Sequence, residues 1–419
     1  MQRVRMSLPY YRANGWDPVV LAVGPAWQGC IQDDELVGTL PPEVRVVRTR
    51  AFSAGWTRHV GIGSVGLRAW LFFFWSGTRL LKKERFDLVF FSTTQFLMFT
   101  LGPLWKRRFG VPYLLDIQDP WRTDYYERAG ARKPPGGWKY QFARLQAWMF
   151  EGWVIRGAGA IMSVSVSYLD DLRARYPKIE RTPTAVLQFG ASRNDIVQAA
   201  LKPGSAGKFF RRTGEKRLVY TGASGPVMPQ ALLVLFTGLR LYRARFPEKA
   251  DRLRFHFIGT SYVVPGQGRP SVLPIAEQCG VGDLVEEVPH RIGYLDAIRL
   301  QQEADALLLL GSSDLAYSPS KMYLYYLTER PVLGLVFRGS VMEALLDRLS
   351  FAFVVRFTEA GPKDEAYAAL ARAFDLTLED KLSAGRPPRD DAYFRTNYLA
   401  EESTRRQCAL FESAVAPGV

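Results

Sequence analysis

The chain has 419 residues, of which 47% are apolar and 23% charged, a globular composition in a chain too long for one hydrophobic core. Its three cysteines, Cys30, Cys279 and Cys408, lie far apart and its three histidines form no cluster, which argues against a disulfide framework and a metal site and favours a reducing compartment. The net charge of +14 is concentrated in residues 1–195, which hold 27 Lys/Arg against 16 Asp/Glu, whereas the remainder holds 28 against 25.

Short apolar runs alternate with amphipathic segments along the first half, which predicts strands joined by helices in a doubly wound parallel sheet. A first helix is expected over residues 3–14 and ends at Gly15. The predicted strands that follow are residues 19–23, 44–47, 86–92, 113–117, 160–164 and 184–187. The predicted helices between them are residues 67–83, a helix that ends at Arg108, and residues 140–156 and 167–176.

A polar stretch rich in Gly, Lys and Arg, residues 202–216, is expected to connect two domains. Alternation resumes after it, with predicted strands at residues 217–221, 254–258, 284–288, 306–310, 332–336 and 352–355. A last amphipathic helix is predicted over residues 393–414. The domains that we expect are therefore residues 1–195, residues 196–388, and a C-terminal helical segment at 389–419.

The most informative segment is residues 304–335. Residues 306–310 are a continuous apolar run, typical of a strand buried on both faces of a parallel sheet. A polar loop follows, and we expect Ser320 to cap a helix over residues 322–328 with Lys321 beside the cap. A helix N-terminus attracts anions, and a cation beside it adds to that attraction. Ser320 and Lys321 are therefore candidates for phosphate contact; a solvated surface lysine is the alternative.

This segment resembles the donor-nucleotide segment of the family 4 glycosyltransferases. The residues that match are Ser318, Pro319, Ser320, Lys321, Tyr323, Leu327, Arg330, Pro331 and Val332. The chain departs from the family at Leu324, where a ribose-binding Glu is usual, and at Glu329, where Gly is preferred. The side chain of Leu324 cannot accept a hydrogen bond from a ribose hydroxyl.

The resemblance implies an α/β protein of GT-B fold, with two Rossmann-like doubly wound domains facing a cleft and a C-terminal helix that crosses back to the first domain. A chain of this family normally opens with a strand and a Gly-rich loop, whereas here the helix with Arg3 and Arg5 begins at once. We therefore expect the first strand to be absent from this sequence and to be encoded upstream. Arg3 and Arg5 are expected on the acceptor side.

Glycine-containing turns follow the first two strands of the second domain. Gly222, Ser224 and Gly225 lie in the first turn, where glycines let backbone N–H groups approach a phosphate. Gly259 and Thr260 end the next strand and are candidates for contact with the nucleotide base, with a plain turn as the alternative.

A cationic clamp that many family members carry after the first turn is not recognisable here. Arg291 is the candidate that would replace it, and a surface arginine is the alternative.

A second resemblance lies in residues 116–121, which match the family's D-h-R-D-h-W segment except for Gln118. The carboxyl ends of strands face the ligand crevice in open α/β sheets. Asp119 is thus the catalytic candidate, which would orient or deprotonate an acceptor hydroxyl. Asp116 and Trp121 are expected on the acceptor side. The alternative is that Asp119 caps a turn and Asp116 pairs with an arginine.

The basic first half indicates an anionic partner. The sequence has no recognisable nucleic-acid-binding motif, so we expect no nucleic acid. The aromatic run at residues 70–75, with Arg68, Arg79, Lys82 and Lys83, is a candidate for contact with an anionic membrane, and the domain core is the alternative. Without a signal peptide or an uninterrupted apolar span of 18 residues, we expect a cytoplasmic protein peripheral on the inner face of a membrane.

The resemblance implies a retaining glycosyltransferase of cell-surface polysaccharide synthesis, with a nucleotide-sugar donor and a glycan or lipid-linked acceptor. No metal or other cofactor is expected. The alternative from another class is a non-catalytic GT-B binding or scaffold protein, which Leu324 favours. A GT-B epimerase is a further alternative, but its paired carboxylates are not recognisable in this sequence.

Overall fold

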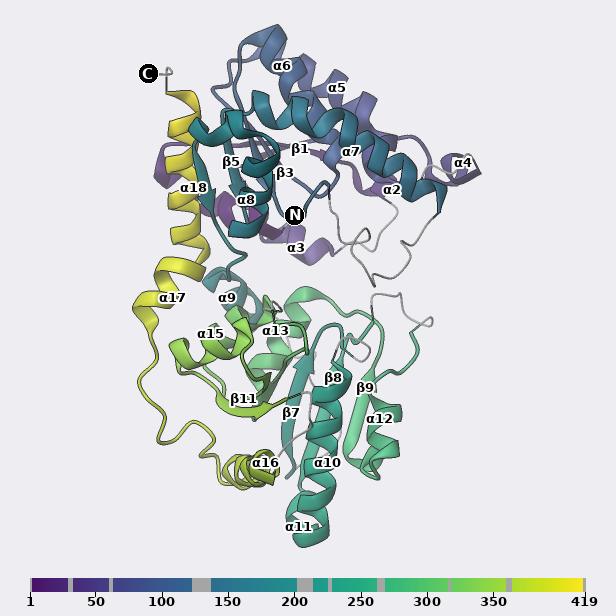
Figure 1. Cartoon of the computed structure of the whole chain (residues 1–419), viewed down its shortest axis with the longest axis vertical. Helices are drawn as coiled ribbons and strands as arrows, with labels where there is room; N and C mark the ends of the chain where they lie inside the picture. The colour runs from purple at the N-terminus through teal and green to yellow at the C-terminus, as the bar shows by residue number, and fades with distance from the viewer. Residues whose placement is uncertain are drawn as a thin grey trace. The chain divides into compact units, whose positions relative to one another are not determined.

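The computed structural model describes residues 2–28, 33–59, 63–122, 137–201, 214–224, 228–261, 268–315, 317, 319–358 and 364–416. The chain divides into two compact units (Figure 1). Unit 1 comprises residues 1–32, 40–190 and 400–419, and unit 2 comprises residues 33–39 and 191–399. The boundaries expected from the sequence were 195/196 and 388/389. Residues 202–213 of the expected connection, and Ser318 and Gly225, lie outside the described residues.

Unit 1 contains two parallel sheets. Its strands are β1 (Val19–Val23), β2 (Arg45–Thr49), β3 (Val89–Ser92), β4 (Tyr113–Ile117), β5 (Ala160–Ser163) and β6 (Thr184–Val186). Strand β1 pairs with β2, and the other four form a sheet in the order β3-β4-β5-β6. The helices of unit 1 are α1 (Gln2–Ser7), α2 (Pro25–Gln28), α4 (Ala54–His59), α5 (Val65–Lys83), α6 (Leu101–Phe109), α7 (Trp138–Gly157), α8 (Val166–Arg175) and α18 (Ala400–Val415).

The first predicted helix is interrupted. After α1 the chain continues as two 3-10 turns, Leu8–Tyr10 and Arg12–Asn14, and ends at Gly15 with φ of 81°. Pro9 explains the break, because a proline has no N–H to donate and its ring clashes with the carbonyl one turn earlier. The prediction of one continuous helix over residues 3–14 was therefore wrong.

Unit 2 is built on one six-stranded parallel sheet. Its strands are β7 (Lys216–Thr221), β8 (Leu253–Ile258), β9 (Val285–Val288), β10 (Ala306–Leu310), β11 (Val332–Phe337) and β12 (Phe353–Phe357). Their order, β12-β11-β10-β7-β8-β9, places the first strand in the middle, as in a doubly wound fold. The helices of unit 2 are α3 (Asp34–Gly38), α9 (Arg193–Leu201), α10 (Pro229–Arg245), α11 (Pro247–Ala250), α12 (Leu273–Gln278), α13 (Tyr294–Glu303), α14 (Lys321–Thr328), α15 (Val341–Leu349), α16 (Asp364–Leu378) and α17 (Asp391–Tyr398).

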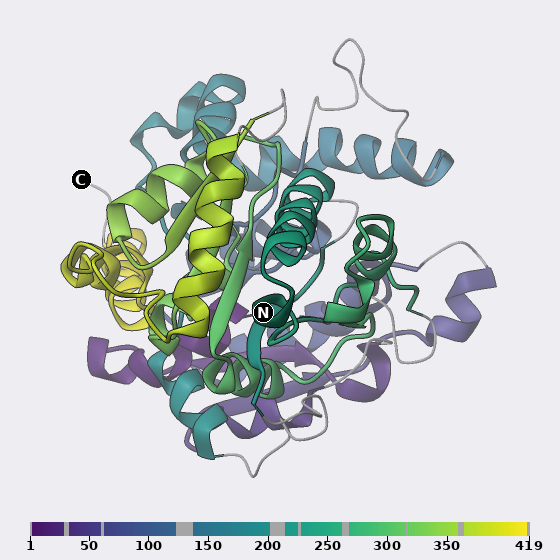
Figure 2. The same cartoon turned by 90° about the horizontal axis from the view of Figure 1, so that it is seen from below.

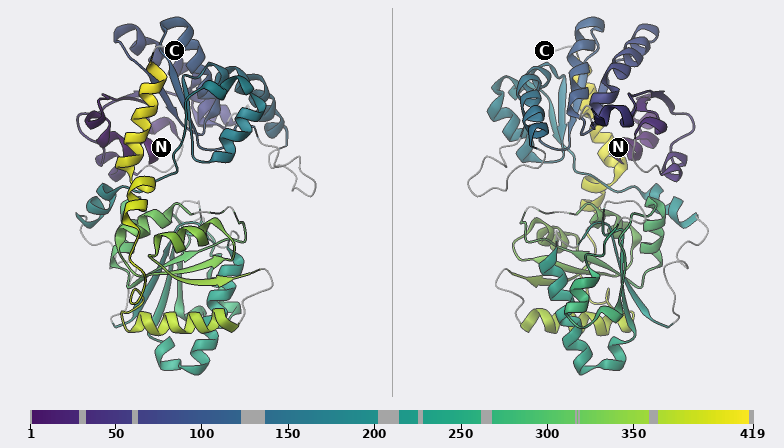
Figure 3. Two further views of the ribbon diagram at one scale, coloured as in Figure 1. Left: turned by 60° about the vertical axis from the view of Figure 1, so that its left-hand side comes forward. Right: turned by 90° about the vertical axis from the view of Figure 1, so that its right-hand side faces the viewer.

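The sheet of unit 2 is covered on both faces, as Figure 3 shows. Successive side chains of β10 alternate between two cores: Leu308 and Leu310 join the core beneath α10 and α16, whereas Leu307 and Leu309 join the core beneath α14 and α15. Helices α10 and α16 lie side by side on the first face (Figure 2). Burial on both faces explains why the strand is apolar at every position.

The predicted C-terminal helix over residues 393–414 is two helices. Leu399 separates α17 from α18 and is extended, with φ of −75° and ψ of 135°. The N–H of Ala191 donates to the carbonyl of Tyr398 at 2.8 Å, which takes this peptide group out of a helical pattern. Helix α18 then packs on β4, β5 and β6 and belongs to unit 1 (Figure 3).

Candidate functional site

The carboxyl ends of β7, β8 and β9 are joined by backbone hydrogen bonds that continue past the strands. The N–H of Gly222 donates to the carbonyl of Ile258 and that of Gly259 to the carbonyl of Val288, both at 2.7 Å. Both glycines have positive φ, 108° and 74°, which residues with a side chain rarely adopt. The two glycines therefore lie next to each other in tight turns at one edge of the sheet.

Lys321, the first residue of α14, extends to the turn after β7. Its Nζ lies 3.6 Å from the centroid of the Tyr220 ring, is shielded from solvent and has no hydrogen-bond partner. A Cβ placed on Gly222 would lie 3.1 Å from this nitrogen. Burial lowers the pKa of Lys321 to about 7. The site thus presents a buried cation with one aromatic neighbour directly beside a glycine turn.

Helix α14 is held firmly against the sheet. The N–H of Thr221, at the end of β7, donates to the hydroxyl of Tyr325 at 3.2 Å. Helix α17 stacks two rings on α14: the ring centroids of Phe394 and Tyr326 are 3.9 Å apart, and those of Tyr398 and Tyr323 are 4.2 Å apart. These contacts fix the position of Lys321 relative to Gly222.

The two serines of the predicted donor site differ in their surroundings. Ser224 is buried, its N–H donates to the carbonyl of Thr260 at 3.2 Å, and its Oγ has no hydrogen-bond partner. Ser320 is exposed and its side chain makes no capping bond, so the predicted cap was wrong. Its backbone is already helical, with φ of −58° and ψ of −24°, and its carbonyl accepts from the N–H of Tyr323.

The backbone N–H groups of Gly222 and Ser224 are both engaged in hydrogen bonds, although the sequence suggested that they would be open to a phosphate. The hydroxyl of Thr260 donates to Glu287, whose carboxylate also accepts the N–H groups of Ser271, Val272 and Leu273. The Thr260 side chain is therefore directed at Glu287, a residue that the sequence analysis did not single out.

Arg291 and Leu324 lie at the margins of this cluster. Arg291 is exposed in the loop between β9 and α13, next to His290, whose carbonyl is 3.9 Å from the position of a Cβ on Gly259. Leu324 is half-buried and packs against the apolar cluster of Ala199, Leu295 and Ile298. Its packing gives an apolar residue a structural role at the position where the resembling family has a glutamate.

In unit 1, Asp116 pairs with an arginine, which is the alternative that the sequence left open. The Nε of Arg3 lies 2.9 Å from Oδ2 of Asp116, and the two side chains are 4% and 0% exposed. Ser92 and Gln118 donate to the same oxygen, and Arg3 also donates to the carbonyl of Leu187 at 2.6 Å. Arg5 instead donates to the side chain of Gln2 at the surface.

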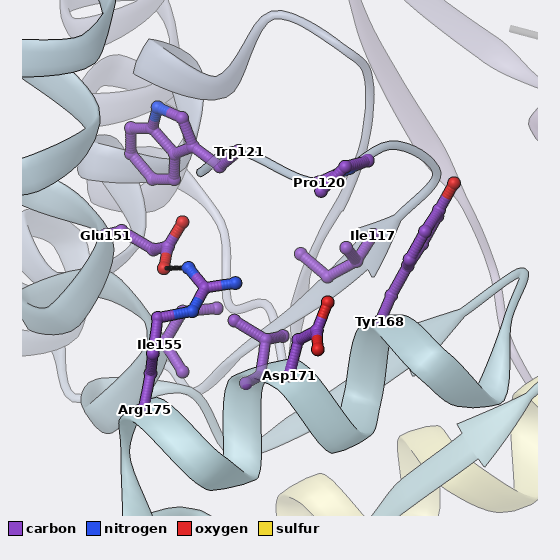
Figure 4. Close-up of a pocket in the computed structure, with 9 residues that line it drawn as sticks. Ile117, Pro120, Trp121, Glu151, Ile155, Tyr168, Asp171 and Arg175 are labelled. Carbon is purple, nitrogen blue, oxygen red and sulfur yellow. Dashed lines mark hydrogen bonds and ion pairs between the residues drawn. The ribbon is translucent and has the colours of Figure 1, made fainter. Parts of the chain in front are cut away.

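A small pocket lies beyond the end of β4 (Figure 4). Its wall combines the loop after β4 with α7 and α8, and the lining residues are Ile117, Pro120, Trp121, Glu151, Ile155, Tyr168, Asp171, Leu172 and Arg175. Trp121 is fixed by stacking on Phe96 at 5.6 Å. Asp119 is exposed, yet partial desolvation of its carboxyl raises its pKa. Its charge contributes to the raised pKa of Tyr168.

Glu151 is the functional candidate of this pocket that the sequence analysis missed. It is buried in the middle of α7, pairs with Arg175 and accepts the hydroxyl of Tyr176 at 3.0 Å, while its Oε2 has no hydrogen-bond partner. Burial raises its pKa and Arg175 opposes that shift. The sequence offers one indication of it: Glu151 is the first acidic residue after residues 128–150, which contain none.

Among the residues that the structure describes, no three His, Cys, Asp or Glu side chains gather as a metal site would require. Within the same residues, no helix has the length and apolar character needed to cross a bilayer.

Residues 2–190 match the family described as glycosyl transferase 4-like domain. None of the curated protein sequences matches the chain. A glycosyltransferase from Rickettsia africae is similar over 100% of this chain and 95% of its own, with 14% identity and a TM-score of 0.55. HepE from Anabaena, in complex with UDP-glucose, covers 97% of this chain and 94% of its own, with 12% identity and a TM-score of 0.55.

WaaG, a glycosyltransferase involved in lipopolysaccharide biosynthesis, covers 99% of this chain and 93% of its own, with 12% identity and a TM-score of 0.50. These similarities confirm the expected architecture and the resemblance to family 4 glycosyltransferases. The chain has the GT-B fold, and its residues 2–190 are similar to the family described as glycosyl transferase 4-like domain.

Proposed function

We propose that the protein is a retaining glycosyltransferase that moves a sugar from a nucleotide donor to a glycan or lipid-linked glycan acceptor in cell-surface polysaccharide synthesis. The observation that carries the proposal is the shielded, unpaired ammonium of Lys321 beside Gly222. A buried cation without a hydrogen-bond partner is costly, and a diphosphate would compensate it. The UDP-glucose held by HepE and the part of WaaG in lipopolysaccharide biosynthesis support the donor class and the pathway class.

On the donor side, Lys321 would bind the diphosphate and stabilise the negative charge that develops on it as the sugar leaves. The buried Oγ of Ser224 supplies a further donor, and the missing side chain of Gly222 leaves room for the phosphates. Ser320, Gly225 and Arg291 are proposed to contact the same group, and Gly259 and Thr260 to lie near the base. We propose that Lys321 takes the place of a metal cation, so that no metal or other cofactor is required.

On the acceptor side, we propose that Asp119, in the loop after β4, orients the attacking hydroxyl or takes its proton; partial desolvation raises its pKa, which makes the carboxylate a stronger base. The acceptor oxygen forms the new bond to the anomeric carbon as the bond from that carbon to the diphosphate breaks. The hydroxyl proton leaves on Asp119 or on the departing diphosphate. Trp121 offers an aromatic face beside this loop, and the buried pair of Arg3 and Asp116 holds the strand end that carries it.

A second candidate is a non-catalytic GT-B protein that binds or scaffolds partners in glycan assembly. The observation that favours it is Leu324, which packs in an apolar cluster and offers no acceptor to a ribose.

Calorimetric titration with UDP, GDP and ADP tests the proposal, followed by measurement of nucleotide release from the matching sugar nucleotide with and without chelator. We expect one nucleotide to bind selectively and release to depend on a glycan or lipid-linked acceptor. No binding by folded protein would overturn the donor site. Selective binding without transfer to any acceptor would favour the scaffold, and loss of release in chelator would overturn the metal-free mechanism.

A further inference from the structure

Helices α4 and α5, with the residue that precedes α4, carry large apolar side chains that form one exposed surface. Phe52 is 40% exposed, Trp56 66%, Leu71 40% and Trp75 60%, and the rings are linked through the half-buried Phe72. The ring centroids of Phe52 lie 6.5 Å from those of Trp56 and 5.1 Å from those of Phe72, which in turn lies 6.2 Å from Trp75. Leu71 is one turn before Trp75 on α5. We call these five side chains the aromatic patch.

Polar contacts inside unit 1 fix the backbone that carries the patch. Arg68 of α5 is 3% exposed, and its guanidinium donates to the carbonyl of Phe52 at 2.7 Å. The N–H of Phe52 donates in return to the carbonyl of Arg68 at 3.1 Å. Thr57 of α4 is 2% exposed, and its hydroxyl donates to the carbonyl of Ser53 at 2.9 Å. The segment before α4 is therefore tied to α5, so the exposed rings are held in place on the surface.

The aromatic run of residues 70–75 is divided between two sides of α5. Trp70, Phe73 and Phe74 pack on the core of unit 1, and Arg68 is buried. For these four side chains the alternative stated with the sequence, the domain core, applies. Membrane contact stays a prediction for the rest of the run, which belongs to the aromatic patch.

Basic side chains continue the exposed side of α5 beyond the patch. Arg79, Lys82 and Lys83 are all exposed. At 3.6 residues per turn, Arg79 and Lys82 point within about 40° of the direction of Trp75 around the helix axis. The same side of α5 is therefore aromatic over one stretch and cationic over its last turns.

Acidic residues are absent from this part of the sequence. Residues 44–83 contain no Asp or Glu, and the carboxylate of Glu84, which follows them, lies 2.5 Å from the guanidinium of Arg45. The main elements packed on α5 are β1, β2, α6 and the 3-10 turn Phe96–Thr100, and their sequences also contain no acidic residue. The electrostatic potential beside the aromatic patch is therefore positive.

An anionic bilayer matches this combination of side chains. Exposed contiguous apolar patches mark sites of interaction. Tryptophan, phenylalanine and leucine beside lysine and arginine are typical of helices in the head-group region, because the indole is apolar with one polar end. Trp56 and Trp75 are more than half exposed and stand out from the surface, and Figure 1 shows α4 at the outer edge of unit 1. Projecting rings suit insertion into a soft surface.

A second copy of the chain fits the aromatic patch less well. A twofold axis through the patch would bring Arg79, Lys82 and Lys83 of both copies into one interface, where like charges repel. Anionic head groups would instead attract the same three side chains.

We propose that the aromatic patch docks unit 1 on an anionic lipid bilayer, with Trp56 and Trp75 in the head-group region and Arg79, Lys82 and Lys83 on lipid phosphates. The docking rests on the proposed function only for its purpose, which is to bring the protein to a lipid-linked acceptor. Its physical basis is independent of nucleotide binding.

Co-sedimentation of the full chain with phosphatidylcholine vesicles, with and without phosphatidylglycerol, tests the docking. The test variant is Trp56→Gln/Trp75→Gln, and the control is Trp148→Gln/Trp153→Gln, which removes two indoles of α7 that are 68% and 42% exposed. We expect the test variant to lose at least ~10-fold in partitioning and the control less than ~2-fold, because burial of an indole in the bilayer contributes to binding only where the patch inserts.

A second pair of variants tests the charges. Arg79→Gln/Lys82→Gln removes two positive charges beside the patch, and Lys178→Gln/Arg181→Gln removes two from the exposed side of the 3-10 turn Pro177–Arg181, so the net charge of the two proteins is equal. Wild type should bind vesicles with phosphatidylglycerol more tightly than those without, and less tightly at high salt. The first variant should lose at least ~5-fold on phosphatidylglycerol and the second less than ~2-fold.

The docking is overturned if wild type does not bind vesicles, if either test variant binds like wild type, or if either control loses as much as its test variant. A wild-type dimer in light scattering that Trp56→Gln/Trp75→Gln breaks, without vesicle binding, would assign the patch to a second copy instead. Nucleotide titration of this variant should match wild type, so failure of the docking and failure of the donor site are seen in separate experiments.

Discussion

The Nζ of Lys321 lies 3.6 Å from the centre of the Tyr220 ring, on the strand that leads into the Gly222 turn. The ring face attracts the cation, but it supplies none of the hydrogen bonds that the ammonium has in water. An ammonium in this position should increase the affinity for an anionic ligand and decrease the stability of the ligand-free protein. A substitution of Lys321 therefore allows both the ligand affinity and the stability to be measured.

Lys321→Met should separate binding from stability. Nucleoside diphosphate affinity is expected to fall by about 10- to 100-fold, because a charge-assisted hydrogen bond is worth ~1–3 kcal/mol. The empty variant should be more stable than wild type near pH 6, since a buried unpaired ammonium is replaced by an apolar chain of similar length. Calorimetry and thermal unfolding measure the two effects.

Lys381→Met is the control for that substitution, because Lys381 is exposed and pairs with Glu379 at 3.1 Å. It should change neither quantity. Unchanged nucleotide affinity in Lys321→Met would remove Lys321 from the site.

Nucleotide affinity should fall as pH rises above 7. Burial lowers the pKa of Lys321 from 10.5 to about 7 in the empty protein, and a bound diphosphate would raise it again. Binding above pH 7 therefore takes up a proton and weakens by at most ~10-fold per pH unit. Titrations in two buffers with different heats of ionisation measure the uptake directly, and Lys321→Met should abolish it.

The same shift affects the stability of the empty protein with the opposite slope. Between pH 7 and 10.5 the unfolded chain holds a proton on Lys321 that the folded chain has released, so this group makes stability rise with pH in that window. Below pH 7 both states are protonated and the full cost of burial remains. A nucleotide affinity that does not change between about pH 6 and 9 would contradict this account.

The twelve strands among the described residues overlap the twelve that the sequence predicts, because burial in a parallel sheet leaves continuous apolar runs. The phosphate-site candidates also fall where strand ends and a helix start are expected. What the sequence could not supply is which polar groups meet over long separations. Glu287 accepts the N–H of Val272 at the start of α12, and Glu151 accepts a hydrogen bond from Arg175 of α8. No local sequence pattern indicates either of these pairs.

The sequence could not predict how the ends of α14 are formed, because these ends depend on backbone conformation. Ser320 has the right residue type for a cap, but its φ and ψ are those of the helix itself. Glu329 ends α14 with φ of 58°, the left-handed conformation that explains why glycine is preferred there in the resembling family. Such features depend on how α14 packs between the sheet and α17, which is a tertiary property.

Gly222→Ala should impair the donor site beyond its cost to the fold. Its φ of 108° is strained for alanine, and the new Cβ would lie 3.1 Å from Nζ of Lys321. Gly280→Ala is the matched control, since Gly280 has φ of 76° and nothing within 4 Å of the added atom. Each should lose ~1–2 kcal/mol of unfolding free energy, but only Gly222→Ala should weaken nucleotide binding. Equal affinity in the two variants would show that the turn after β7 does not face the ligand.

Arg3→Met tests whether the buried pair at the end of β4 is structural. The substitution leaves Asp116 charged, fully buried and held by Ser92 and Gln118 alone, which is expected to cost ~3–5 kcal/mol of unfolding free energy. Arg12→Met removes an exposed partner of Asp17 and should cost less than ~1 kcal/mol. Adding Asp116→Asn to Arg3→Met should recover part of the loss, because the uncompensated charge is gone.

Urea unfolding of the four proteins measures these differences, and nucleotide titration serves as a second readout. If Arg3→Met is as stable as wild type, the buried charge of Asp116 is stabilised by groups other than Arg3. Transfer assays of the variant would then test the acceptor-side role that the sequence suggested for Arg3. Arg3→Met that loses stability but, once folded, transfers sugar at the normal rate would assign the pair to the stability of the fold, because a group that touches the acceptor or positions the loop of Asp119 and Trp121 could not be removed without slowing the reaction.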